Sequence, residues 1–418
     1  MTRQHINKAG SFPARSLLAL LACAATLSLA APAAAQTSGS LYSGFGQGGF
    51  AVYALGSRVA GLASVVQPDG KIVEVASATV NGTNVIAAVR LLSNGHRDTS
   101  FGRNGWAIVP ISSSATGTSI ALQTNGDILL GGSGRDIATG EEALAAVRLL
   151  ANGRLDPSFG IGGIALVPVG NAAVANGIGI QSSGQIVLAG TAVNGHDEFV
   201  AARLNTNGTL DASFGSNGIE LLSPIAAAWG LAIERDGSLV LGGEEQNAQG
   251  TWNYMAARLT ANGTPDPGFG ANGVVIIPIG VYAAGLAVTV QSDGKIILAG
   301  NVIEKNRLVA TVRLLGDGSL DTTFGQQGIA TFPGTGGQAV TMEGSKILLA
   351  GPGASAVRLN PDGSFDTTFG KRGLVLAPIG SNDAANGVVI DPLDNTILLA
   401  GAATINGTVE LTEIKLYG

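Results

Sequence analysis

Cysteine, histidine and charged side chains are all scarce in this sequence. Its 418 residues include one cysteine, Cys23, three histidines, and only 12% Asp, Glu, Lys and Arg. A single cysteine cannot form an internal disulfide bond, so packing alone has to hold the fold together. Acidic residues outnumber basic ones, and the formal net charge is −6. Because no basic surface is available to neutralise phosphates, nucleic acid is excluded as a partner.

The residue patterns of common catalytic and metal sites are also missing. The sequence has no His-x-x-x-His or His-Glu-x-x-His spacing for zinc and no Gly-x-Ser-x-Gly nucleophile turn. Its many glycines precede expected strands rather than helices, so they do not indicate a phosphate site. Beyond residue 35 no apolar run of 18 residues occurs, which excludes a membrane-spanning helix. The sequence therefore predicts no catalytic residue, no metal site and no cofactor.

The first 35 residues have the character of a secretory signal peptide. A basic start is followed by an apolar run over 17–30 and by three alanines that end at Ala35. This order predicts cleavage between Ala35 and Gln36, leaving 36–418 as a single exported domain, either secreted or periplasmic. Leu20-Leu21-Ala22-Cys23 resembles a lipoprotein box, but the apolar run before Cys23 is too short to favour a lipid anchor.

The dipeptide Phe-Gly returns at nearly even intervals along the chain. Its phenylalanines are Phe45, Phe101, Phe159, Phe214, Phe269, Phe324 and Phe369, at intervals of 56, 58, 55, 55, 55 and 45 residues. Each unit contains four short strand-like runs separated by Asp-Gly and Asn-Gly turns, and no segment with helical periodicity. A repeat of this length and content predicts an all-β, seven-bladed β-propeller with four antiparallel strands in each blade.

The phase of the repeat assigns positions to the strands. The strand that carries small residues around a glycine is placed nearest the crowded axis. Its glycines are Gly61, Gly117, Gly177, Gly230, Gly285 and Gly387. The last unit then lacks its fourth strand, and the N-terminal run over 50–54 matches the missing one. We expect that run to pair in the last blade and to close the ring, which removes exposed sheet edges.

An arginine and an aspartate recur eight residues apart in six units. The pairs are Arg90–Asp98, Arg148–Asp156, Arg203–Asp211, Arg258–Asp266, Arg313–Asp321 and Arg358–Asp366. In the unit that joins the chain ends, the equivalent residues are Lys415 and Tyr42. A fixed offset in every blade is typical of a structural clamp, because a charge between blades needs a partner. The Phe-Gly phenylalanines are likewise expected to be buried between blades.

The complete repeat also resembles a known family. The recurring Gln-x-Asp-Gly-Lys-Ile-x-Leu-Ala-Gly, then Val-Arg-Leu, then Gly-Ser-Leu-Asp-Thr-Thr-Phe-Gly-x-x-Gly resembles the delta-60 repeat of bacterial β-propellers, and more distantly propellers of the NHL type. The resemblance covers 39–418. It implies an exported repeat protein and brings no activity or catalytic residues with it.

Segments that differ between repeats are the best candidates for a site, because scaffolds usually carry function on variable loops. In a meander, the loops between second and third strands share one face with the crossovers between units, and both vary here. The residue before the innermost-strand glycine varies too: Ala60, Thr116, Asn176, Trp229, Ala284, Gly336 and Asn386. Trp229 is suited to stacking on a sugar. Trp252 and Tyr254, with Asn176 and Asn386, complete the predicted ligand-binding set.

The sequence thus predicts an exported, non-catalytic and monomeric scaffold that binds an unknown protein or glycan ligand through its variable face. Two alternatives stay open. One is a structural surface or matrix protein. The other is a propeller hydrolase or lyase, similar to lactonases, with carboxylates in the central channel. Glu234, Glu343 and Asp391, at the ends of the innermost strands, are the candidates for that chemistry.

Overall fold

Every regular element in the described part of the chain is a β-strand. The computed structural model describes residues 37–222, 226–334 and 337–418, so the predicted leader, Cys23, the Ala35–Gln36 cleavage position and Gly336 lie outside it. β-Branched and aliphatic runs such as Val274–Ile277 form the strands. Glycines at positive φ, such as Gly318 at 86°, form the turns. The all-β prediction is confirmed.

The strands form seven consecutive groups of four, numbered here as blades 1 to 7. The first strands of the blades are β2 (Ser57–Val66), β6 (Ala115–Leu122), β10 (Ala172–Ile180), β14 (Ala226–Ile233), β18 (Tyr282–Val290), β22 (Ala339–Glu343) and β26 (Ser381–Ile390). The second strands are β3 (Ile72–Val80), β7 (Ile128–Arg135), β11 (Ile186–Val193), β15 (Leu239–Gln246), β19 (Ile296–Ile303), β23 (Lys346–Gly351) and β27 (Ile397–Ile405). The third strands are β4 (Thr83–Leu91), β8 (Glu142–Leu149), β12 (Asp197–Leu204), β16 (Trp252–Leu259), β20 (Arg307–Leu314), β24 (Ser355–Leu359) and β28 (Thr408–Leu416). The outer strands are β5 (Trp106–Val109), β9 (Ile164–Val167), β13 (Ile219–Leu222), β17 (Val274–Ile277), β21 (Ile329–Pro333), β25 (Leu374–Leu376) and β1 (Phe50–Tyr53).

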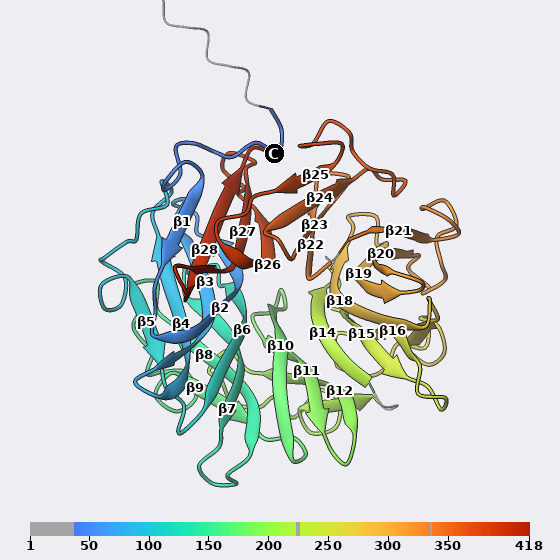
Figure 1. The fold of residues 1–418 in the computed structure, drawn as a ribbon. Helices are drawn as coiled ribbons and strands as arrows, with labels where there is room; N and C mark the ends of the chain where they lie inside the picture. Colours follow the sequence, from blue (N-terminus) through green and yellow to red (C-terminus); the bar gives the residue numbers. More distant parts are fainter. Residues whose placement is uncertain (1–36, 223–225, 335–336) are drawn as a thin grey trace, which may run out of the picture. The chain divides into compact units, whose positions relative to one another are not determined.

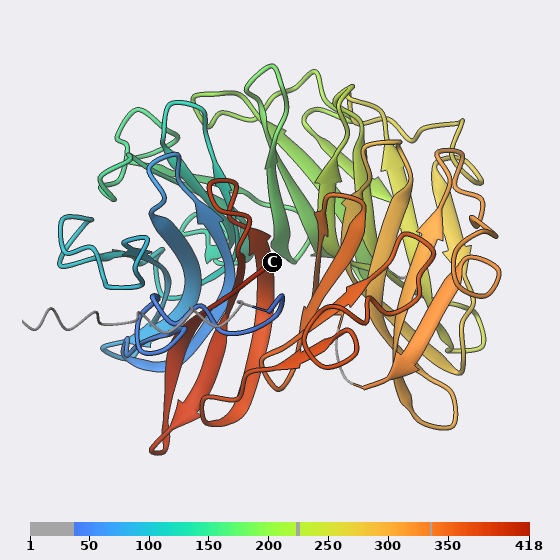
Figure 2. The same ribbon diagram turned by 90° about the horizontal axis from the view of Figure 1, so that it is seen from above.

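Each blade is an antiparallel meander in which neighbouring strands in the sequence pair. Blades 2 and 3 are also joined by one parallel bridge, Ala172 to Glu142, which links them into a single eight-stranded sheet. In the view of Figure 2 the strands run between two faces, and the connecting loops lie at their ends. The first-to-second turns and the third-to-outer connections therefore share one face. The remaining loops share the other.

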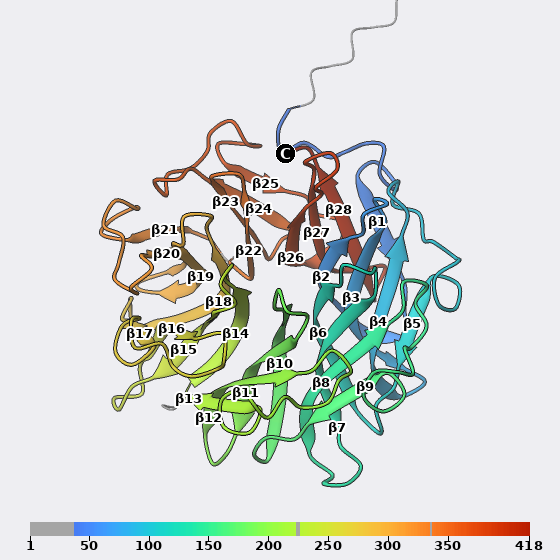
Figure 3. The same ribbon diagram turned by 180° about the vertical axis from the view of Figure 1, so that it is seen from behind.

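The first strands surround the centre of the ring. Each contacts the first strands of both neighbouring blades, from β2 through β6, β10, β14, β18 and β22 to β26, and back to β2 (Figures 1 and 3). Small residues allow this approach: a Cβ on Gly177 would stand 2.6 Å from the Cβ of Leu231 in the next blade. The predicted innermost position of the glycine-bearing strand is thus the observed one.

The N-terminal strand closes the ring, as predicted. β1 pairs with β28 in antiparallel register, with Phe50 opposite Ile414 and Tyr53 opposite Leu411. The closing strand therefore covers an edge of blade 7 that would otherwise present unpaired backbone groups.

Apolar side chains fill the spaces between neighbouring blades rather than one central core. The cluster between blades 1 and 2, for example, joins Val73 and Ile86 to Ile128 and Leu130. All seven Phe-Gly phenylalanines are completely buried. Burial on both faces explains why the strands are continuous apolar runs rather than strict alternations.

Candidate functional site

A cavity of about 620 Å³ lies at the centre of the ring, and every blade contributes to its lining. The lining residues come from the seven first strands and from Gln338, which directly precedes β22, and they are mostly small or aliphatic, with a few hydroxyl and amide side chains. A cavity of this size, apolar with a few polar groups, has the usual character of a small-ligand site.

A ring of seven side chains, one per blade, surrounds this cavity. In six blades the first strand carries a bulge, where one extra residue interrupts its pairing with the second strand. The bulge residues and the equivalent residue of blade 6, which we call the bulge ring, all line the cavity: Leu62, Thr118, Asn176, Trp229, Leu286, Gln338 and Asn386.

The bulge ring corrects the sequence alignment of these positions. Aligning on the strand glycine wrongly equated Ala60, Thr116 and Ala284 with Trp229, because in those blades the bulge follows the glycine rather than preceding it. Every member of the ring lies five residues before the polar residue that ends its strand, such as Gln67 or Glu234. Counting back from the turn is the sequence signal that finds the ring.

Three polar members of the ring bond to the neighbouring blade. The Asn176 amide donates to the carbonyl of Ala228 at 2.7 Å, and the Asn386 amide donates to the carbonyl of Gly61 at 2.8 Å. Thr118 donates to the carbonyl of Ala175 in the same way. Asn176 and Asn386 therefore line the cavity as predicted, but their amide groups already link the innermost strands to one another.

Trp229 differs from these residues because its polar atom bonds within its own blade. Its indole Nε1 donates to Oε1 of Glu244 at 3.2 Å, and the Tyr282 hydroxyl lies 3.5 Å from Oε2 of the same carboxylate. Burial raises the pKa of Glu244 above its ordinary value, against the lowering effect of these two hydrogen bonds. The Trp229 side chain is 41% exposed, so a carboxylate fixes the edge of its indole while much of the ring stays open.

The other two predicted aromatic residues are not part of this site. Tyr254 is fully buried, and its hydroxyl donates to the carbonyl of Ala310 on β20 at 3.2 Å. Trp252 lies opposite Gln246 at the start of β16 and does not line the cavity. Residues two apart on a strand share a face, and here that face packs against blade 5. The structure therefore does not bring Trp252 and Tyr254 to the cavity that Trp229 lines.

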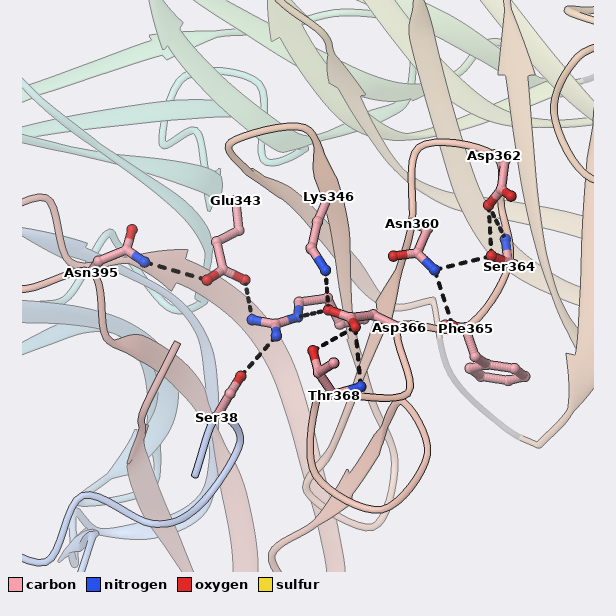
Figure 4. Close-up of polar contacts among 11 residues, drawn as sticks. Ser38, Glu343, Lys346, Asn360, Asp362, Ser364, Phe365, Asp366, Thr368 and Asn395 are labelled. Carbon is pink, nitrogen blue, oxygen red and sulfur yellow. Dashed lines mark hydrogen bonds and ion pairs between the residues drawn. The ribbon is translucent and has the colours of Figure 1, made fainter. Parts of the chain in front are cut away.

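The three carboxylates considered for catalysis do not line the cavity either. The Arg358 guanidinium donates to Glu343 at 2.8 Å, and the Lys415 ammonium lies 3.0 Å from Asp391. Glu234 lies at the equivalent turn of blade 4, where burial raises its pKa. In Figure 4 dashed lines join the Glu343 carboxylate to the guanidinium that also pairs with Asp366, and to Asn395 of blade 7. The structure thus spreads these carboxylates over the face that carries the first-to-second turns and the third-to-outer connections.

The repeated arginines connect neighbouring blades on that face. Each arginine Nε lies 2.7–2.9 Å from the aspartate eight residues later, and its guanidinium carbon stands 4.6–5.0 Å from the centre of the Phe-Gly ring. In blade 3, Arg203 also donates to the carbonyl of Ala261 in blade 4 at 2.7 Å, while Asp211 accepts from the backbone of Ser213 at 3.1 Å.

A second cavity, of about 350 Å³, lies between blades 5 and 6. Its lining is largely apolar and includes Phe332, Phe365 and Leu376, the last of which is exposed. The strands of blade 6 are the shortest in the ring, so they leave this space uncovered. The interval of 45 residues before Phe369 was the sequence signal of that shortening.

Six segments of the chain match a family described as a domain of unknown function (DUF5122) beta-propeller. They are residues 67–101, 123–159, 181–214, 234–269, 291–324 and 346–369. The chain carries this domain six times. The first five matched segments begin in the turn after the first strand, and the sixth begins at Lys346 on β23. All six end at the Phe-Gly phenylalanine, so they contain the clamp and exclude the bulge ring. No curated protein matches the chain.

Several solved structures share the fold at low sequence identity. Drosophila Semaphorin 2a is 8% identical with a TM-score of 0.53, over 90% of this chain and 76% of that one. The polysaccharide lyase Uly1 is 11% identical with a TM-score of 0.51, over 89% of this chain and 93% of that one. A protein of unknown function from Dyadobacter fermentans is 11% identical with a TM-score of 0.46, covering 87% and 98%. The two likenesses with a TM-score above 0.5 show a shared fold and no more.

Residues 37–222, 226–334 and 337–418 contain no helix long and apolar enough to cross a membrane. Within the same ranges, no group of three or more His, Cys, Asp or Glu side chains is placed to hold a metal ion.

Proposed function

We propose that this protein is an exported, non-catalytic binding scaffold that holds a glycan in the mouth of its central cavity. The observation that carries the proposal is the exposed indole of Trp229 on the wall of that cavity. Sugar rings stack on tryptophan faces through their C–H groups, while a polar edge group fixes the orientation of the ring.

Three features of the site support a bound glycan. The cavity volume of about 620 Å³ suits one or a few sugar rings. The Thr116 hydroxyl on the cavity wall offers a hydrogen-bond partner beside the bonded residues of the bulge ring, and Glu244 holds the Trp229 indole by its nitrogen. The leader, the resemblance to exported repeat proteins and the variable loops at this end of the strands agree with a ligand met outside the cytoplasm.

The direct test is fluorescence titration of the purified protein with glycans first selected on a glycan array. We expect binding to quench the tryptophan emission, and Trp229→Ala to weaken the affinity at least about tenfold because the stacking surface is lost. Trp252→Phe is the matched control, since Trp252 does not line the cavity. Equal affinity in Trp229→Ala and the wild type, or binding lost in Trp252→Phe alone, contradicts the proposal.

A further inference from the structure

Two glutamates meet in the buried interface between blade 7 and blade 1. Glu74 on β3 and Glu413 on β28 are both completely buried. Neither carboxylate oxygen of Glu74 has a hydrogen-bond partner, and Oε2 of Glu413 has none. The Ser64 hydroxyl donates to the remaining oxygen, Oε1 of Glu413, at 3.2 Å. Burying two such anions is costly unless something compensates their charge.

The same positions are apolar in the other blades, except for Thr311 in blade 5. Ser64 pairs with Glu74 in the sheet register, and the equivalent pairs are Ile120–Leu130, Ile178–Leu188, Leu231–Leu241, Val288–Leu298, Val340–Leu349 and Val388–Leu399. The residues equivalent to Glu413 are Ala88, Ala146, Ala201, Ala256, Thr311 and Ala356. The scaffold therefore does not need polar groups here, and three of them gather at one interface.

Further oxygen atoms complete the surroundings of the two carboxylates. A Cβ built on Gly61 would lie 2.0 Å from Oε1 of Glu74 and 2.3 Å from the carbonyl oxygen of Gly401, so these two acceptors face the same small space. With Ser64 Oγ, the site offers carboxylate, hydroxyl and carbonyl oxygens and no nitrogen or sulfur ligand. Acceptors outnumber the nearby donors, which are the Ser64 hydroxyl and the backbone N–H of Gly401 beside Glu74, and such an excess of acceptors is what a bound cation requires.

We propose that Glu74, Glu413, Ser64 and the Gly401 carbonyl form a calcium site that joins blade 7 to blade 1. Two carboxylates match the charge of a divalent ion, and an all-oxygen set with two potentially bidentate carboxylates suits the six to eight ligands of Ca²⁺. Soft or nitrogen-preferring metals find no matching ligand. Ser64 also lines the central cavity, which gives the ion an entry path.

The site links the two ends of the ring. Glu413 lies on the strand that β1 pairs with, opposite Ala51, while Glu74 and Ser64 belong to blade 1. An ion held from both sides therefore stabilises the closed ring over any form in which blade 7 and blade 1 separate.

The first test measures the metal content and thermal unfolding of the full-length protein. After dialysis against calcium, we expect about one Ca²⁺ per chain by mass spectrometry. The melting temperature should be about 3 °C or more higher in about 5 mM CaCl₂ than in EGTA, and magnesium should raise it less. The proposal is overturned if the protein binds no calcium and melts at the same temperature in calcium and in EGTA. That is also the result expected if protons, rather than an ion, neutralise the two carboxylates.

Variants then locate the ion. Glu74→Leu with Glu413→Ala restores the residues of the other blades, so we expect it to fold, to bind no calcium and to melt at one temperature in both buffers. Glu74→Gln, which preserves side-chain shape, should weaken calcium binding at least about tenfold. Glu234→Gln, in the turn of blade 4, is the control and should leave binding unchanged. Calcium retained by Glu74→Gln at wild-type affinity contradicts the assignment even if the double variant does not fold.

Discussion

The interface between blades 3 and 4 and the interface between blades 7 and 1 share their apolar and backbone contacts but differ in their charged residues. In blade 3, Arg203 pairs with Asp211 at 2.8 Å and reaches into blade 4. In blade 7, Lys415 takes the place of the arginine and Tyr42 the place of the aspartate. Lys415 pairs instead with Asp391 at 3.0 Å and Asp394 at 2.9 Å, in the turn between β26 and β27 of its own blade.

The difference follows from the position of the chain ends. Where the chain is continuous, the clamp aspartate follows its arginine by eight residues and folds with it. At the closing blade the equivalent position belongs to the N-terminal segment, at the other end of the chain. Because Lys415 is paired within blade 7, its charge is compensated whether or not the N-terminal segment has docked.

The apolar and backbone contacts of the repeat, in contrast, are kept at the closing interface. Phe45 is fully buried, and Gly46 donates to the carbonyl of Asn94 at 2.7 Å, as Gly215 donates to that of Asn262 at 2.8 Å. The N-terminus also supplies blade 7 with its missing turn, since Ser38 accepts from Gly370 at 2.9 Å and its hydroxyl accepts from Arg358 at 2.7 Å. Ser38 is visible beside this cluster in Figure 4. Closure thus depends on packing and backbone pairing more than on charge.

The largest effect is expected from removing the closing segment. Deletion of residues 36–56 takes away β1, Phe45 and the Ser38 contacts, and it leaves the β28 edge unpaired. We expect the melting temperature to fall by at least about 10 °C, or cooperative unfolding to be lost, because a fully buried phenylalanine alone contributes about 3–5 kcal/mol. Circular dichroism during heating measures this, and an unchanged melting temperature contradicts closure by this segment.

A smaller effect is expected from breaking one repeated clamp. Arg203→Ala leaves Asp211 nearly buried without its partner and removes the bond to Ala261, so we expect a loss of about 3 kcal/mol in the free energy of unfolding. Arg203→Lys should recover part of this, because an ammonium can pair with the carboxylate but cannot also reach the carbonyl with a planar fork. Denaturant titration measures both variants.

The matching exchange at the closing blade sharpens the comparison. Lys415→Arg places the repeat's own cation beside Asp391 and Asp394, where no clamp aspartate exists. We expect it to gain no stability. An Arg203→Ala variant within about 0.5 kcal/mol of the wild type, or a Lys415→Arg variant clearly more stable, contradicts the division between the two interfaces.

The fold was predictable from the sequence because each repeat specifies the same short-range structure. The turn glycines, the Phe-Gly spacing and the aliphatic runs fix four strands per unit, and the phase of the last unit fixes the partner of 50–54. The site was less predictable. The bulge moves relative to the glycine from blade to blade, so aligning on Gly61 or Gly285 misplaced the residues that face the cavity.

Contacts between blades were the least predictable feature. Tyr254 lies on the face of its strand that packs against blade 5. The sequence of that strand does not reveal which of its faces is covered by the next blade. Glu74 and Glu413 lie near opposite ends of the sequence and meet only because the ring closes. Each was visible as a departure from its repeat, a glutamate in place of Leu or Ala, but their proximity required the three-dimensional arrangement.

The smallest expected effect concerns acid stability, which depends on the clamp carboxylates. Burial alone raises the pKa of Asp321, but hydrogen bonds from Thr323, together with Arg313 and Lys295, lower it to about 2. This folded-state pKa lies below the ordinary value of 3.8, so the stabilisation is complete above about pH 4 and is lost as the pH falls toward 2. Asp321→Asn removes the titrating group, so its denaturation midpoint should fall less steeply than that of the wild type between pH 5 and pH 2.

Tyr42→Phe, at the equivalent position of the closing blade, removes no carboxylate and should keep the wild-type slope. Parallel pH profiles for Asp321→Asn and the wild type show that this clamp makes no contribution to acid sensitivity.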